Sequence, residues 1–174
     1  GQLENSPFRF VSKPKAAEGA IHVYRDKECD QMVKAARELP IGAPIRWDIL
    51  ILTALCTGMR RGELLALRWE HIQPDGIRVR ESFVRGITKT PKSDRARTVL
   101  MSTEMHGFLE ELRRSRRKRE GAWSDPGLVF TTATGGQWHE QNFGRSWRRL
   151  RKRCVDDDGK ALVRPLAFHC ARHS

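Results

Sequence analysis

The sequence is poor in tyrosine, has no closely spaced cysteines and lacks a long hydrophobic run. Tyr24 is the only tyrosine among 174 residues, and the cysteines stand at positions 29, 56, 154 and 170 without any C-x-x-C pair. This spacing argues against a disulfide-stapled secreted domain and indicates reduced thiols. The longest apolar run, 49–56, is interrupted by Thr53 and is far shorter than the ~20 residues that cross a bilayer. We therefore expect no membrane span.

Positive charge is what the chain has in excess. It carries 33 Lys and Arg against 21 Asp and Glu, a net charge of +12 at pH 7. A chain of this length forms one domain and buries about two thirds of its unfolded surface, so it needs no metal or disulfide for stability. Residues 1–15 do not have the order of a secretion signal, and we expect a cytoplasmic location. The charge indicates a polyanionic partner, namely nucleic acid.

Five segments show the periodicity of helices. Apolar residues recur at helical spacing after Asp26, the expected N-cap, and Pro40 ends this first segment. The second segment is apolar on every side, which predicts a helix packed in the core, and Gly58 ends it. The predicted helices cover residues 26–39, 47–57, 61–69, 102–119 and 143–154.

Three further segments have the pattern of strands. Apolar and polar residues alternate over 77–83, and residues 87–89 and 98–101 flank the turn-rich sequence TPKSD. The fold class that we predict is α+β, a mainly helical domain with a small antiparallel β-sheet, spanning residues 21–174. Residues 1–20 are polar and lack an apolar period, which predicts a linker from a domain upstream.

Three short segments, which we call islands, contain side chains that packing alone does not require and that could take part in chemistry. Arg60 lies at the break between the second and third helices with Glu63 on the same face, Lys89 lies on a strand, and His169 and Arg172 are three residues apart. A guanidinium at a helix start can bind an anion, and His169 and Arg172 could share one phosphate. Each of these side chains taken singly also fits an ordinary surface position.

A zinc site is the alternative interpretation of the last island. His169 and His173 are four residues apart, with Cys170 adjacent and Cys154 as a further candidate. Structural zinc sites usually contain closely spaced cysteine pairs, and a catalytic H-x-x-x-H helix needs a glutamate where this chain has Cys170. Arg172 would also repel the ion. We expect no metal.

Three motifs in order resemble the tyrosine recombinases, also called phage-type integrases. TGMRRGELLALRWEHI is similar to that family's first arginine box, TKTPKSDRARTVLM to its lysine-bearing hairpin and HCARHS to its H-x-x-R-H box. The resemblance covers roughly residues 24–174. It implies DNA strand cleavage and rejoining through a 3′-phosphotyrosyl intermediate, without a cofactor.

The resemblance also implies roles for individual residues. Arg60 and Arg172 would clamp the scissile phosphate, and His169 would assist proton transfer there. Lys89 would protonate the departing 5′ oxygen, with Lys92 as the alternative general acid. Glu63 would orient Arg60, and His173 would support the second box.

The family's nucleophilic tyrosine lies beyond its second box, where this sequence ends at Ser174. Tyr24 precedes every motif, so we do not assign it as the nucleophile. We therefore expect these residues to bind DNA without cleaving it, and we expect the parent protein to have a further N-terminal DNA-binding domain. By resemblance the parent would form a tetramer on DNA, whereas the fragment would be monomeric.

Two basic segments are the expected DNA-binding surface, together with the loop after Lys89. The candidates are Lys92, Arg95, Arg113, Arg114, Arg116, Arg117, Arg145 and Arg148. Long basic side chains also cover exposed helix faces, so we expect only some of these to contact DNA. A non-catalytic DNA-binding module remains the alternative function. A metal-dependent nuclease is disfavoured because the sequence lacks a carboxylate cluster.

Overall fold

The computed structural model describes residues 22–39, 45–89, 96–120 and 127–173. The predicted linker, 1–20, lies outside these residues. The elements in chain order are α1 (Asp26–Arg37), α2 (Trp47–Thr57), α3 (Arg61–Leu65), the 3-10 helix η1 (Trp69–His71), β1 (Ile72–Gln73), β2 (Gly76–Val79), β3 (Ser82–Val84), β4 (Ile87–Lys89), β5 (Arg97–Leu100), α4 (Thr103–Glu120), α5 (Glu140–Arg151) and the 3-10 helix η2 (Phe168–His173). This content confirms the predicted α+β class. No helix within the described ranges is long and apolar enough to span a membrane.

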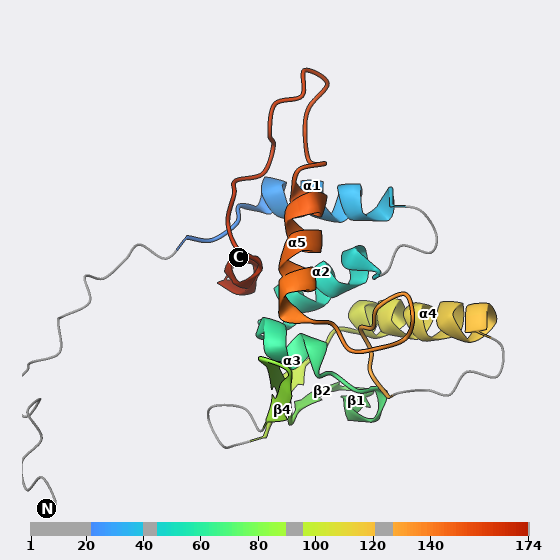
Figure 1. The fold of residues 1–174 in the computed structure, drawn as a ribbon. Helices are drawn as coiled ribbons and strands as arrows, with labels where there is room; N and C mark the ends of the chain where they lie inside the picture. Colours follow the sequence, from blue (N-terminus) through green and yellow to red (C-terminus); the bar gives the residue numbers. More distant parts are fainter. Residues whose placement is uncertain (1–21, 40–44, 90–95, 121–126, 174) are drawn as a thin grey trace, which may run out of the picture.

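Helix α2 is the centre of the hydrophobic core. Ile49, Leu50, Ile51 and Ala54 are fully buried on different sides of it, as the apolar segment predicts. The helix ends where Gly58 adopts a left-handed conformation with φ of 59°. Helices α1, α4, α3 and η2 all pack against α2 (Figure 1).

The first helix begins differently from the prediction. Arg25, and not Asp26, is the N-cap, and Asp26 lies in the first turn. The reason is Glu28, whose carboxylate accepts a hydrogen bond of 2.8 Å from the backbone N–H of Arg25. This contact satisfies a donor that a helix start otherwise leaves free.

The strands form two antiparallel sheets where one was predicted. Strand β2 lies between β1 and β5, whereas β3 and β4 form a separate hairpin. The pairing of β2 with β5 ends at Val79, so the predicted strand 77–83 is divided between the two sheets. The hairpin turn consists of Arg85 and Gly86, both with positive φ, which is the geometry that joins two strands by two residues.

The third helix is shorter than predicted. It ends at Leu65 because the following backbone pairs with a distant segment instead of continuing the helix. Leu67 O accepts a hydrogen bond of 2.7 Å from Val129 N, and Trp69 N donates one of 2.8 Å to Gly127 O. The helical spacing of the leucines at 64, 65 and 67 could not reveal this long-range pairing.

Candidate functional site

The break between α2 and α3 presents Arg60 to solvent. Gly58 turns the chain, Met59 is buried, and Arg60 occupies the N-cap of α3. Its backbone N–H donates to Glu63 Oε2 at 2.8 Å, and its Nη1 donates to Glu63 Oε1 at 3.2 Å. The Arg60 side chain is 51% exposed, so one edge of the guanidinium is held while the rest is open to an anion.

Glu63 is the buried anchor of this arrangement. Its side chain is 1% exposed and also accepts two hydrogen bonds from the guanidinium of Arg97, at 2.9 Å and 2.8 Å. Burial alone would raise the pKa of Glu63, but the hydrogen bonds from Arg97 and Arg60 lower it overall. Glu63 is therefore a carboxylate that holds two arginines. The predicted contact between Glu63 and Arg60 is present, while its role in orienting Arg60 for chemistry stays a prediction.

Arg97 was not predicted as a site residue. The predicted strand began at Thr98, one residue after it, and the motif TKTPKSDRARTVLM contains Arg97 but was given a role only through its lysines. Arg97 and Val99 occupy the half-buried face of β5, whereas Thr98 and Leu100 are exposed. A signal was present, because Arg97 shares the alternating face of Val99 and therefore points toward the interior.

Lys89 lies at the end of the hairpin that packs on α3. Gly62 permits this approach, because a Cβ there would lie 2.6 Å from Ser82 Oγ and 2.8 Å from Phe83 O. Ser82 is the register partner of Lys89, whose side chain is exposed. The α3–hairpin contact thus links the Arg60 and Lys89 segments. Lys92 and Arg95 lie outside the described residues.

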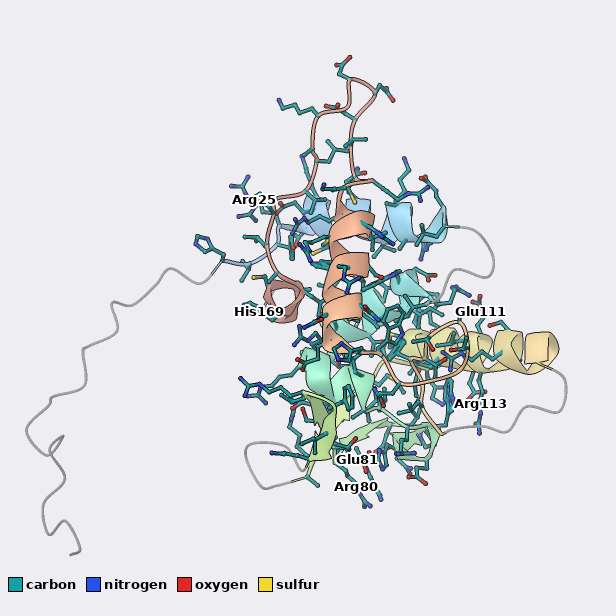
Figure 2. All side chains as sticks on the ribbon, in the orientation of Figure 1. Arg25, Arg80, Glu81, Glu111, Arg113 and His169 are labelled. Atoms are coloured by element: carbon teal, nitrogen blue, oxygen red, sulfur yellow. The ribbon has the colours of Figure 1, made fainter. Side chains whose placement is uncertain are left out.

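The third island is on η2, which packs against α2. His169, which Figure 2 labels, is exposed. Its neighbours Phe168, Cys170 and Ala171 are buried. The structure describes the backbone of η2 through His173, but the side chains of Arg172 and His173 are outside its description. Residues three apart lie in line on a 3-10 helix, so positions 169 and 172 share one side. Because α3 and η2 both pack against α2, the first and third islands are connected through that helix.

The predicted basic surface is only partly exposed. Arg114, Arg145 and Arg148 are exposed, and Arg113 lies with its guanidinium 5.5 Å from the Trp69 ring centroid. The prediction that Arg116 belongs to this surface is wrong. Its side chain is buried and donates from Nη1 to Leu128 O at 3.1 Å. The side chain of Arg117 lies outside the description.

Tyr24 is unsuited to be a nucleophile. It is 2% exposed, and its hydroxyl donates to Leu166 O. Burial raises its pKa to about 12, with smaller opposing effects from Arg151. As for metal binding, the described residues contain no group of three or more His, Cys, Asp or Glu side chains that could hold an ion.

Comparison with known proteins finds one family. The model of the phage integrase family matches residues 22–174. Over 175 residues the chain is 32% identical to a shufflon-specific DNA recombinase of Escherichia coli, covering 99% of this chain and 36% of the relative. Over 199 residues it is 26% identical to a XerC-like tyrosine recombinase of Caldanaerobacter subterraneus subsp. tengcongensis, covering 100% of this chain and 49% of the relative. The chain thus spans a third to a half of the length of these relatives.

Solved structures have the same fold. The Tn1549 transposon integrase in complex with transposon right end DNA matches with a TM-score of 0.70 at 18% identity, over 91% of this chain and 53% of that one. The lambda integrase catalytic core matches with a TM-score of 0.58 at 16% identity, over 87% of this chain and 78% of that one. The family match includes all three islands, and the chain therefore belongs to the phage integrase family.

Proposed function

We propose that the protein containing this chain is a site-specific DNA recombinase and that these residues form most of its catalytic domain. The observation that carries the proposal is the half-exposed guanidinium of Arg60, held by the buried carboxylate of Glu63 at the start of α3. A guanidinium favours a phosphate oxygen. The predicted general acid lies on the hairpin packed against the same helix.

The proposed reaction divides the work between a tyrosine and four side chains of this chain. A tyrosine from outside these 174 residues gives its hydroxyl proton to His169 and attacks the phosphorus, and the bond from phosphorus to the 5′ oxygen breaks. Arg60 and Arg172 neutralise the charge that develops on the non-bridging oxygens, with His169 beside them, and Lys89 gives a proton to the departing 5′ oxygen. In the rejoining step a 5′ hydroxyl gives its proton to Lys89 and attacks the phosphotyrosine, the bond from phosphorus to the tyrosine oxygen breaks, and His169 returns a proton to that oxygen. The bond energy is kept in the covalent intermediate.

Double-stranded DNA is the proposed partner. The net charge of +12 and the exposed arginines at 114, 145 and 148 support binding to a phosphate backbone. We extend the proposal to a cytoplasmic protein that acts as a tetramer on DNA, with the chain as a piece of it that is monomeric when alone. Residues 1–20 would then lead from an N-terminal DNA-binding domain, and Lys92 is the second candidate for the general acid.

Covalent trapping on DNA tests the proposal. The protein from the complete reading frame is incubated with a pool of nicked duplexes of randomised sequence, in which cleavage releases a short 5′-hydroxyl strand and leaves the protein attached. We expect a covalent complex whose yield falls on the order of 100-fold in Arg60→Ala, while DNA affinity changes little. The control is Arg78→Ala, which removes an exposed arginine of β2.

A non-catalytic DNA-binding module is the second candidate, and the burial of Tyr24 favours it. If the complete protein forms no covalent complex but binds duplex DNA with an affinity that falls steeply with salt, this second function is correct. Equal losses of binding and trapping in Arg60→Ala would also contradict the catalytic assignment.

A further inference from the structure

An ion pair joins the start of α1 to the segment that leads into η2. The carboxylate of Glu28 accepts hydrogen bonds from the backbone N–H of Arg164 at 2.8 Å, from its Nε at 2.9 Å and from its Nη2 at 2.6 Å. Arg164 Nη2 also donates to Val23 O at 2.6 Å. In Figure 1 the blue stretch before α1 accordingly lies beside the red chain before η2.

A second contact anchors the same segment two residues later. The carbonyl oxygen of Leu166 accepts a hydrogen bond from the hydroxyl of Tyr24, and Arg151 Nη1 and Trp147 Nε1 donate to it at 2.6 Å and 3.4 Å. Three donors from two separate parts of the chain thus converge on one backbone atom. We call Tyr24, Glu28, Arg164 and Leu166 the N-terminal brace.

The brace lies directly before His169. Phe168 follows Leu166 by two residues and is buried, with its ring 5.1 Å from those of Phe143 and Trp147. The chain is therefore held by polar contacts at Arg164 and Leu166 and by packing at Phe168. His169 is the next residue and faces solvent. A displacement of the brace would move the start of η2.

The hydrogen bonds of the brace indicate that its main role is to fix the position of the chain before η2. The N-cap of α1 needs only one carboxylate oxygen of Glu28, the one that binds Arg25 N at 2.8 Å. Both carboxylate oxygens of Glu28 also accept hydrogen bonds from Arg164. Replacing such a pair by apolar residues is often neutral for stability, whereas its several directional bonds define one position of the chain.

We propose that Tyr24, Glu28 and Arg164 are positioning residues for His169 and Arg172, acting through the Leu166 carbonyl and η2. The inference rests on the proposed function for the meaning of His169 and Arg172, but the placement itself can be measured without any reaction. Catalytic groups must be held closely, because a displacement of about 1 Å can cost on the order of 100-fold in rate.

The NMR chemical shifts of the histidine rings in the 174-residue chain report whether His169 keeps its position. The chain has six histidines, so assignment is feasible by replacing each in turn. We expect Glu28→Gln, which keeps the shape of the side chain, and Tyr24→Phe, which removes only the hydroxyl, both to shift the His169 resonance. The resonances of His71, His106 and His139 should stay in place.

Asp48→Asn is the matched control. Asp48 pairs with Arg46 at 2.8 Å, and the two side chains are 7% and 40% exposed, close to the 8% and 39% of Glu28 and Arg164. This pair belongs to the start of α2 and extends through Arg46 to Glu111 of α4. We expect Asp48→Asn to leave the His169 resonance unshifted. An unshifted His169 resonance in Tyr24→Phe, or an equal shift in Asp48→Asn, would overturn the inference even if Glu28→Gln fails to fold.

The complete protein then separates this inference from the proposed function. In the trapping assay we expect Glu28→Gln to lower the rate of covalent attachment about 10- to 100-fold while DNA affinity stays within about twofold. If the unmodified protein forms no covalent complex, the proposed function fails and the resonances still decide whether the brace places η2. If trapping succeeds but Glu28→Gln attaches at the rate of Asp48→Asn, the brace has no positioning role.

Discussion

Arg97 of β5 and Glu63 of α3 form a bidentate ion pair. Both nitrogens of the Arg97 fork donate to the carboxylate, one to each oxygen, at 2.9 Å and 2.8 Å. The same carboxylate oxygens accept from the backbone and side chain of Arg60. Arg97 therefore fixes the group that fixes Arg60, and the strand after the 90–95 loop takes part in placing the arginine of the first box.

Replacing Arg97 tests this arrangement. Arg97→Lys keeps the charge but loses the planar guanidinium that binds both carboxylate oxygens. The Glu63 side chain would then be less fixed, and so would Arg60, which it binds. In the covalent trapping assay we expect Arg97→Lys to lower the cleavage rate at least about tenfold, with DNA affinity nearly unchanged. Arg78→Lys, on the exposed face of neighbouring β2, is the control and should leave both unchanged. A larger loss of affinity than of rate would mean that Arg97 serves DNA binding instead.

Gly62 gives a second prediction about the same junction. A Cβ at this position would meet Phe83 O at 2.8 Å, and a backbone atom cannot easily yield. We expect Gly62→Ala to cost about 1–3 kcal/mol of unfolding free energy and to displace the hairpin that carries Lys89. Urea denaturation measures the first effect, and the trapping assay measures the loss of cleavage.

Gly107→Ala is the control for that substitution. Gly107 lies in α4 with nothing within 4 Å of an added Cβ, so alanine should stabilise the helix by about 0.5–1 kcal/mol. Equal stability of Gly62→Ala and the unmodified chain would show that the hairpin does not need the close approach.

The sequence predicted those parts of the fold that depend on local pattern. Helix α2 was predicted with its correct ends, because an apolar segment followed by a glycine depends on neighbours in sequence. The end of α3 could not be predicted, because it depends on long-range hydrogen bonds from Val129 N to Leu67 O and from Trp69 N to Gly127 O. The division of the strands likewise depends on which segments pair, and alternation alone carries no information about partners.

For the site, the motifs identified Arg60, Glu63, Lys89 and His169 but none of the residues that hold them from a distance. Glu63 lies three residues from Arg60, so helix geometry was sufficient to join them. Arg97 is 34 positions away from Glu63 in the chain, and Arg164 is 136 from Glu28. Such partners cannot be found from the sequence, because it does not distinguish an arginine that pairs with a buried carboxylate from one that is fully solvated. For the same reason the sequence does not show that Arg116, within a basic run, is buried.

Arg114 and Arg116 should separate DNA binding from stability. Arg114 is exposed on α4, whereas Arg116 is buried and donates to Leu128 O. We expect Arg116→Leu to leave that carbonyl without this donor and to cost about 1–3 kcal/mol of unfolding free energy, with the salt dependence of DNA binding unchanged. Arg114→Leu should leave stability within about 0.5 kcal/mol and reduce the salt slope by about one. Fluorescence anisotropy with a duplex at several salt concentrations measures the slope, and a reduced slope in Arg116→Leu would contradict the assignment.

The pair of Glu28 and Arg164 predicts how stability depends on pH. The hydrogen bonds from Arg164 lower the pKa of Glu28 to about 2, against an ordinary value of 4.5. A carboxyl whose pKa is lowered by folding contributes stability above its unfolded pKa and loses that contribution as the pH falls toward its folded pKa. Solvent reaches Arg164 and screens the pair, so the contribution is only a part of what the full change in pKa implies. We expect Glu28→Gln to be less stable than the unmodified chain at pH 6, with the difference narrowing steadily between pH 4.5 and pH 2. Urea denaturation across this range measures it, and a difference that stays constant down to pH 2 would show that the ionisation of Glu28 is not the cause of the loss in stability.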